Sequence, residues 1–218
     1  MTSELAHLHF TDTDKPPHDE AEAEALTRDS GTEYVATACI PLFWLCLFSP
    51  ENIRISPPSD LHEYDGQYAP YPYLACARAE ALARLETHKR MMECSLGERY
   101  PLYTQWIDSV AGEPYAHVLV LTEDLIPKYG EAAFEATLRR ALTHLDKSSA
   151  TGVLLMSETL SDLAGLWLGA LPGECDAVDL LGTDIPRGYW AAITVIAPPW
   201  RPTPPSPASP ARPRSASS

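Results

Sequence analysis

The sequence lacks the short motifs that mark the common classes of enzyme. It contains no GxxxxGK[ST] loop, no GxGxxG after an apolar run, and no HExxH, GxSxG or DxDxDG. These motifs serve nucleotide phosphates, dinucleotides, catalytic zinc, nucleophilic serine and calcium, respectively. Their absence leaves no motif that indicates a family, a bound cofactor or a catalytic metal, so we expect no cofactor.

Paired cysteines and a secretion signal are also missing. The five cysteines are odd in number, lie far apart and form no CxxC motif, so they predict no disulfide framework. The N-terminus is acidic and has no basic flank before an apolar core, which argues against a signal peptide. These features favour a reducing cytoplasm. The excess of Arg over Lys, with abundant Ala and Pro, is typical of a GC-rich bacterial genome.

Acidic residues outnumber basic ones, and the net charge is −14. Residues 1–30 carry −6 and residues 31–197 carry −11, whereas residues 198–218 carry +3. Binding to nucleic acid or to anionic lipid requires clustered Lys and Arg, so the charge argues against both partners. It favours encounter with a basic protein, although solubility alone is an equally good explanation.

The longest uncharged stretch runs from Tyr34 to Pro50 and has 17 residues. It is shorter than the ~20 apolar residues that span a bilayer, and Pro41 interrupts it. Its content of Leu, Phe, Trp, Ile and Val suits a strand that is buried on both faces. We therefore expect this stretch to be the central strand of a soluble core.

The two ends of the chain differ in composition from the middle. Residues 1–30 are acidic with little apolar content, so we expect them to be mostly disordered, with Glu20 to Thr27 as the one candidate for a short helix. Residues 198–218 are rich in Pro, Ser and Ala, which predicts a disordered tail. Residues 31–197 are expected to form one globular domain.

Within that domain, strand-like and helix-like patterns alternate. Strands are expected at 33–48, 115–121, 152–156, 176–181 and 189–197, and helices at 74–96, from 101, at 131–145 and at 160–171. This order predicts an α/β or α+β domain with one mixed sheet of four to five strands and about four helices packed on it.

Histidines and carboxylates give no clear catalytic or metal site. No pair of histidines has the usual ligand spacing, and His7, His9 and His18 lie in the segment expected to be disordered, so no metal site is predicted. No residue is assigned as catalytic. Glu123 is the one outside candidate, because it follows an expected strand and α/β enzymes place catalysts at strand ends.

A loop rich in Tyr and Pro, Ser56 to Tyr73, is the most suggestive polar feature. Tyrosine is enriched at interfaces, and prolines reduce the entropy lost when a loop becomes ordered. The alternative is that these tyrosines pack over the edge of the sheet. The candidate binding residues are Asp60, Glu63, Tyr64, Asp65, Tyr68, Tyr71 and Tyr73.

Three functions remain open from the sequence. The first is a non-enzymatic binding protein, most concretely an inhibitor or immunity-type protein that masks a basic toxin or effector. The second is a hydrolase or transferase that uses carboxylates at strand ends. The third is an accessory or scaffold protein whose Pro-rich tail docks a partner. The sequence leaves the oligomeric state open.

Overall fold

The computed structural model describes residues 5–37, 39–58, 70–128, 130–147, 151–152 and 180–185. All of them lie in one compact unit, Met1–Gly188. The strands are β1 (Leu5–Thr11), β2 (Glu33–Thr37), β3 (Ile53–Ile55), β4 (Pro72–Ala77), β5 (His117–Leu121) and β6 (Thr183–Ile185). The α-helices are α1 (Glu20–Asp29), α2 (Leu42–Leu45), α3 (Arg78–Leu96), α4 (Tyr100–Gly112) and α5 (Glu131–Leu145). Short 3₁₀ helices are η1 (Pro50–Asn52), η2 (Gly97–Arg99) and η3 (Glu123–Lys128).

The strands form one sheet in the order β3-β4-β5-β1-β2-β6, and each pairing of described strands is antiparallel. This confirms the expected single sheet with about four helices of more than one turn, and of the two expected classes, α/β and α+β, it is α+β. The sheet was expected to be mixed with four to five strands, but the described strands number six and pair only antiparallel. Two strands, β3 and β6, have only three residues each. The chain therefore builds its sheet around the longer strands β1, β2, β4 and β5.

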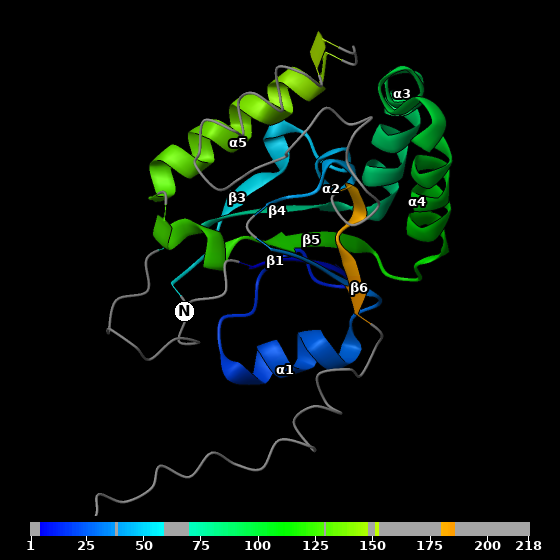
Figure 1. The fold of residues 1–218 in the computed structure, drawn as a ribbon. Helices are drawn as coiled ribbons and strands as arrows, with labels where there is room; N and C mark the ends of the chain where they lie inside the picture. The colour runs from blue at the N-terminus through cyan, green and yellow to red at the C-terminus, as the bar shows by residue number, and fades with distance from the viewer. Residues whose placement is uncertain are drawn as a thin grey trace, which may run out of the picture. The chain divides into compact units, whose positions relative to one another are not determined.

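The helices divide between the two faces of the sheet (Figure 1). Helices α2, α3, α4 and α5 lie on one face, and α1 lies on the other. Side chains alternate along a strand, so β1 presents Ala6, Leu8 and Phe10 to the first face, where each is fully buried. The Phe10 ring contacts the Trp106 ring of α4 there, with centroids 6.4 Å apart.

Helix α5 begins and ends where its apolar period predicts. Phe134, Leu138, Leu142 and Leu145 recur at helical spacing, and all four are fully buried. Helix α4 was also expected from its apolar face, with Pro101 in its first turn. The expected helix at 74–96 begins four residues late, because residues 74–77 continue strand β4.

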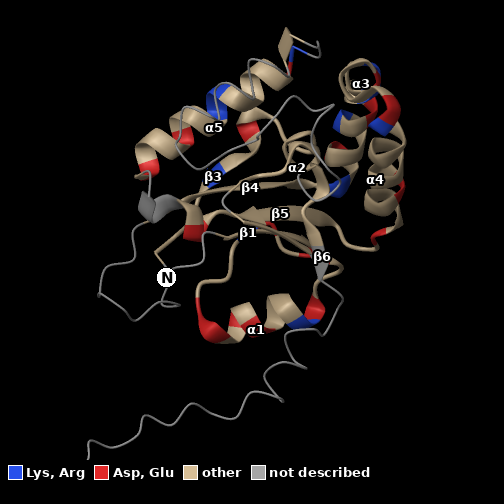
Figure 2. Ribbon diagram, in the orientation of Figure 1, with Lys and Arg blue, Asp and Glu red and all other residues tan. Residues whose placement is uncertain are grey.

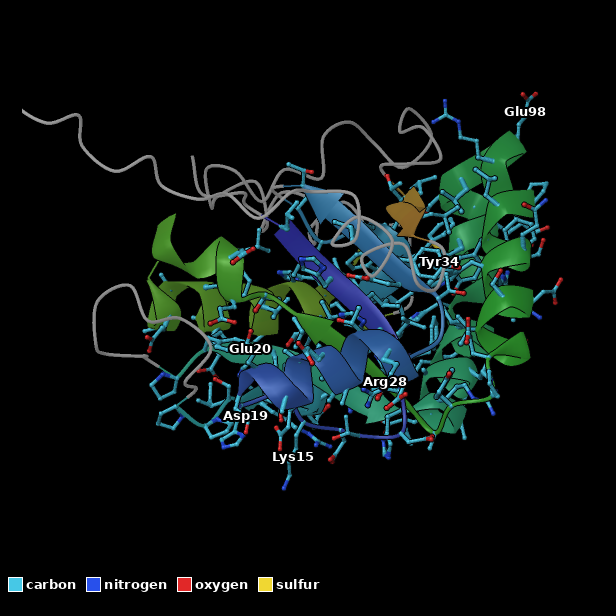
Figure 3. The ribbon with its side chains drawn as sticks, turned by 90° about the horizontal axis from the view of Figure 1, so that it is seen from below. Lys15, Asp19, Glu20, Arg28, Tyr34 and Glu98 are labelled. Atoms are coloured by element: carbon cyan, nitrogen blue, oxygen red, sulfur yellow. The ribbon has the colours of Figure 1, made fainter. Side chains whose placement is uncertain are left out.

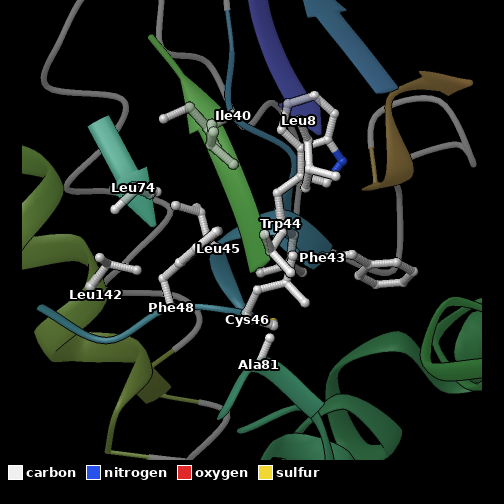
Figure 4. Packing of buried hydrophobic residues seen from close by; sticks show 14 of the residues in the cluster. Leu8, Ile40, Phe43, Trp44, Leu45, Cys46, Phe48, Leu74, Ala81 and Leu142 are labelled. Atoms are coloured by element: carbon white, nitrogen blue, oxygen red, sulfur yellow. The ribbon is translucent and has the colours of Figure 1, made fainter. Parts of the chain in front are cut away.

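The prediction that Tyr34 to Pro50 is one central strand is wrong. Only its first residues belong to a strand, β2, and the chain then turns into the single-turn helix α2 directly after Pro41. The prediction that the stretch is buried is confirmed, since every residue from Ile40 to Phe48 is buried, and Ile40 and Leu42 to Phe48 are 2 % exposed or less (Figure 4). Proline cannot donate to a strand ladder, which explains why an apolar run folds into a turn here.

Trp44 is the largest fully buried side chain of this turn. Its Nε1 donates a hydrogen bond to the Leu181 carbonyl at 2.7 Å, so it joins the start of β6 to the core. Gly182 has a φ of +74°, and a Cβ at this position would lie 2.7 Å from Cζ2 of Trp44. A glycine is therefore required at this close approach.

The prediction that residues 1–30 are mostly disordered is wrong for residues 5–11, which form β1, whereas the short helix considered at Glu20 to Thr27 is present as α1. Strand β1 lies between β5 and β2, and α1 follows it. The apolar content looked low because His7, His9 and Thr11 alternate with the buried apolar residues of β1. The proposed domain boundary at residue 31 therefore cuts through the fold.

Several expectations lie outside the described residues. These are most of the strands at 152–156 and 176–181, the strand at 189–197, the helix at 160–171 and the tail at 198–218. Among the helices that the structure describes, none has the length and apolar character needed to cross a membrane.

Candidate functional site

Two histidines and a glutamate come together on the face of the sheet that carries α1. His7 and His9 alternate with apolar residues along β1, and so they share one face. Glu33 begins β2 and lies directly opposite His9 in the register. One potential ligand atom from each residue lies within 4.8 Å of the other two. We call these three residues the histidine cluster.

Polar contacts within the histidine cluster are short. His7 Nδ1 lies 2.8 Å from Glu33 Oε1, and His9 Nε2 lies 3.9 Å from the same oxygen. The two imidazole rings are stacked, with centroids 6.1 Å apart and planes within 5°. A single carboxylate oxygen therefore faces both rings.

Burial differs between the members of the histidine cluster. His9 is 4 % exposed and Glu33 is 7 % exposed, whereas the His7 side chain is 24 % exposed. Burial lowers the pKa of His9 from 6.5 to about 4, and the nearby Glu33 carboxylate only partly offsets this effect. His9 is neutral at pH 7 as a result, and its Nδ1 is buried without a hydrogen-bond partner.

A hollow of about 680 Å³ lies between α1 and the loop that follows β1. We call it the acidic hollow. Its lining includes three prolines and the apolar Ala25 and Leu26 beside charged residues. The lining residues are Thr11, Asp12, Thr13, Lys15, Pro16, Pro17, His18, Glu22, Ala25, Leu26, Asp29 and Pro57.

Several hydrogen bonds fix the loop that forms one wall of the acidic hollow. Arg54 of β3 donates to both the carboxylate and the carbonyl of Asp14, and this hydrogen bond holds the pKa of the Asp14 carboxyl below its usual range. The Tyr73 hydroxyl donates to the Asp14 carbonyl at 3.4 Å. Asp19 caps α1 by accepting from the Glu22 backbone at 2.8 Å, as expected for an N-cap aspartate.

Charge around the acidic hollow is strongly negative. Residues 12–29 contain seven acids and only two bases, Lys15 and Arg28. Arg28 is paired with Asp29 at 3.0 Å, so its charge is locally neutralised. Acidic residues follow α1 along its length in Figure 2, and Figure 3 shows Asp19 and Glu20 at the opposite end of the helix from Arg28.

The structure places two of the seven predicted binding residues, and both are buried. Tyr71 is 5 % exposed and Tyr73 is 4 % exposed, so neither offers its ring to a partner. Burial raises the pKa of the Tyr71 phenol, and the nearby Glu123 carboxylate adds to this effect. These positions agree with the alternative that the tyrosines pack on the sheet. Asp60, Glu63, Tyr64, Asp65 and Tyr68 lie outside the described residues.

Glu123 lies where the sequence placed it, directly after β5, as the first residue of η3. Its side chain is half-buried, and the preceding Thr122 is fully buried. The structure brings Glu123 and Asp124 near Tyr71, whose pKa they both raise. Glu158 and Asp162, another pair of carboxylates in the sequence, lie outside the described residues.

Sequence reasoning missed the histidine cluster. The absence of a metal site was predicted from a disordered N-terminus, but β1 orders both histidines and β2 supplies Glu33. The missed signal was the spacing of His7 and His9, which is two residues, as expected for neighbours on one face of a strand. Glu33 is 26 residues from His7, and no local pattern indicates that pairing.

Comparisons with known proteins give no identification. No protein-family model matches the chain, and no curated protein or solved structure shows significant similarity to it. Any function must therefore be argued from the residues of the chain itself.

Proposed function

We propose that this chain is a non-enzymatic binding protein for a basic protein, of the inhibitor or immunity type, and that it acts in a reducing cytoplasm. The observation that carries the proposal is the acidic hollow, which combines excess negative charge with a concave, partly apolar lining. Concave sites that combine apolar walls with a few placed charges suit ligand recognition.

The negative charge of the chain favours a basic partner over nucleic acid or an anionic membrane. A net charge of −14 attracts Lys- and Arg-rich surfaces over long range and speeds their encounter. The same charge repels the phosphates of nucleic acid and of anionic lipids. A protruding Lys or Arg side chain of a partner is the group that best complements Asp12 and Glu22 at the acidic hollow, since the third acid of the lining, Asp29, is paired with Arg28.

The lining of the acidic hollow also suits a side chain with an apolar stem. Leu26, Ala25 and Pro16 contribute carbon surface beside the carboxylates. Lys and Arg bury their methylene stems against apolar surface while their charged ends remain near acids. This match of chemistry supports one occupant, a basic segment of another protein.

The predicted contact residues of the tyrosine loop remain part of this proposal. Pro57 lines the acidic hollow, and Asp60 follows it three residues later in the sequence. We propose that Asp60, Glu63, Tyr64, Asp65 and Tyr68 add contacts to the same partner. Tyr71 and Tyr73 are left out, because both are buried.

A basic peptide with alternating Lys and Gly residues provides the direct test. We expect Asp12→Asn with Glu22→Gln, at the acidic hollow, to weaken peptide binding several-fold in isothermal titration calorimetry. The matched control is Glu93→Gln with Glu98→Gln, two exposed acids on α3 and η2. Both pairs remove the same charge, so equal weakening by the two pairs would show general charge attraction and overturn the assigned site.

A further inference from the structure

We propose that His7, His9 and Glu33 form a binding site for a divalent first-row transition metal ion, with Zn²⁺ as its probe. This site is separate from the proposed binding of a basic protein. None of its three residues lines the acidic hollow.

The three side chains offer the donor atoms that transition metal ions prefer. Two imidazole nitrogens and one carboxylate oxygen are the donors of many three-ligand zinc sites, and of iron sites with two histidines and a carboxylate. Hard ions such as Mg²⁺ and Ca²⁺ prefer oxygen donors instead. A tetrahedral ion held by these three residues keeps one position for water or another ligand.

The distances between these donor atoms are close to those around a tetrahedral ion. Zinc bonds of about 2.0 to 2.1 Å place neighbouring tetrahedral ligand atoms roughly 3.3 Å apart. His7 Nδ1 and His9 Nε2 lie 2.8 and 3.9 Å from the same Glu33 oxygen, and all the ligand atoms lie within 4.8 Å. Small rotations about side-chain bonds therefore suffice to close the cluster around an ion.

The backbone fixes these three positions. His7 and His9 are neighbours on one face of β1, a strand paired on both of its sides. Glu33 lies opposite His9 in the pairing of β1 with β2. Sites built on paired strands hold their ligands more precisely than sites on loops, so little entropy is lost when the ion binds.

Two members of the cluster are shielded from solvent. His9 is 4 % exposed, and its side chain, which carries the ligand atom Nε2 nearest Glu33, is 6 % exposed. Glu33 is only 7 % exposed, and a cation beside it would offset the free-energy cost of burying its charge. The partly exposed His7 side chain gives the ion a path from solvent.

The alternative is that His7 and Glu33 form a structural hydrogen bond and that the cluster binds no metal. Untagged protein, stripped with a chelator, is titrated with Zn²⁺ in a calorimeter without any basic peptide present. We expect one saturable ion per chain, and more than about tenfold weaker binding in His9→Leu and in Glu33→Gln. If either variant fails to fold, His7→Gln at the partly exposed position gives the same test.

Two control variants separate this site from adventitious zinc ligands. Cys94 is an exposed thiol on α3, and His144 lies on α5, outside the cluster. Cys94→Ser and His144→Gln should leave the zinc affinity unchanged, and X-ray absorption should show nitrogen and oxygen ligands without sulfur. The proposal is overturned if folded wild-type protein shows no saturable binding. It is also overturned if a control variant abolishes binding while the cluster variants keep it.

Discussion

The two faces of strand β1 differ sharply in chemistry. Ala6, Leu8 and Phe10 are fully buried against the helices α2–α5, whereas His7 and His9 point to the face that carries α1. One strand thus supplies both a hydrophobic core and a cluster of polar, potentially ligating groups. On the proposals made above, stability is concentrated on the first face, and binding chemistry is concentrated on the second.

Deleting residues 1–11, which include both faces of β1, should lower the stability of the domain more than any other change proposed here. The deletion removes β1, which joins β5 to β2 in the middle of the sheet. It leaves two unpaired edges and opens the core, so we expect no cooperative thermal transition by circular dichroism. As a control, deletion of residues 198–218 at the other end of the chain should leave the melting temperature unchanged. Cooperative melting of the first deletion would contradict the central position of β1.

Trp44→Ala should be the most damaging single substitution on the core face. Trp44 is fully buried, and its Nε1 bonds to the Leu181 carbonyl. Loss of a large aromatic side chain from a core costs about 3 to 5 kcal/mol of unfolding free energy. Urea denaturation measures this value. An unchanged midpoint would mean that Trp44 is exposed in solution and that the assigned core is wrong.

A buried histidine on α3 should make the core side sensitive to acid. His88 is 2 % exposed, and burial lowers its pKa to about 4, with Arg84 adding to the effect and Asp146 opposing it. The unfolded chain protonates near pH 6.5, so this histidine favours unfolding as the pH falls from about 6.5 towards 4. Between pH 7 and 5 the loss should be about 2 kcal/mol.

The substitution His88→Leu tests this acid effect. The variant should lose less unfolding free energy than the wild type when the pH falls from 7 to 5, as measured by urea denaturation at both values. An identical loss in the two proteins would show that His88 is already protonated, or accessible to solvent, in the folded state.

Periodic segments were predictable because their patterns are local. Helix α5 matches its expected bounds, and helix α4 and strand β5 lie close to theirs. The apolar run from Ile40 to Phe48 was correctly expected to be buried, but its backbone conformation was not predicted. Burial depends on composition, whereas the turn depends on Pro41 and on tertiary contacts such as Trp44 to Leu181.

The N-terminus and the site were not predictable by the same reasoning. A strand with one apolar and one polar face has modest average hydrophobicity, so β1 resembled a disordered segment. Glu33 meets His7 and His9 only because β1 and β2 pair in one register. That register follows from the whole sheet, and a shift by one residue would send the three side chains to different faces.

Neighbouring substitutions at Leu8 and His9 test the separation of stability and binding most directly. Unfolding free energy is measured in the presence of a chelator, and Zn²⁺ affinity is measured on the folded protein. Leu8→Ala should cost about 2 to 5 kcal/mol of stability and keep the zinc affinity. His9→Leu should stay within about 1 kcal/mol of wild type, because it replaces a buried unpaired polar group, and should weaken zinc binding more than tenfold. Loss of stability in His9→Leu as large as in Leu8→Ala, with zinc affinity unchanged in both, would contradict the account.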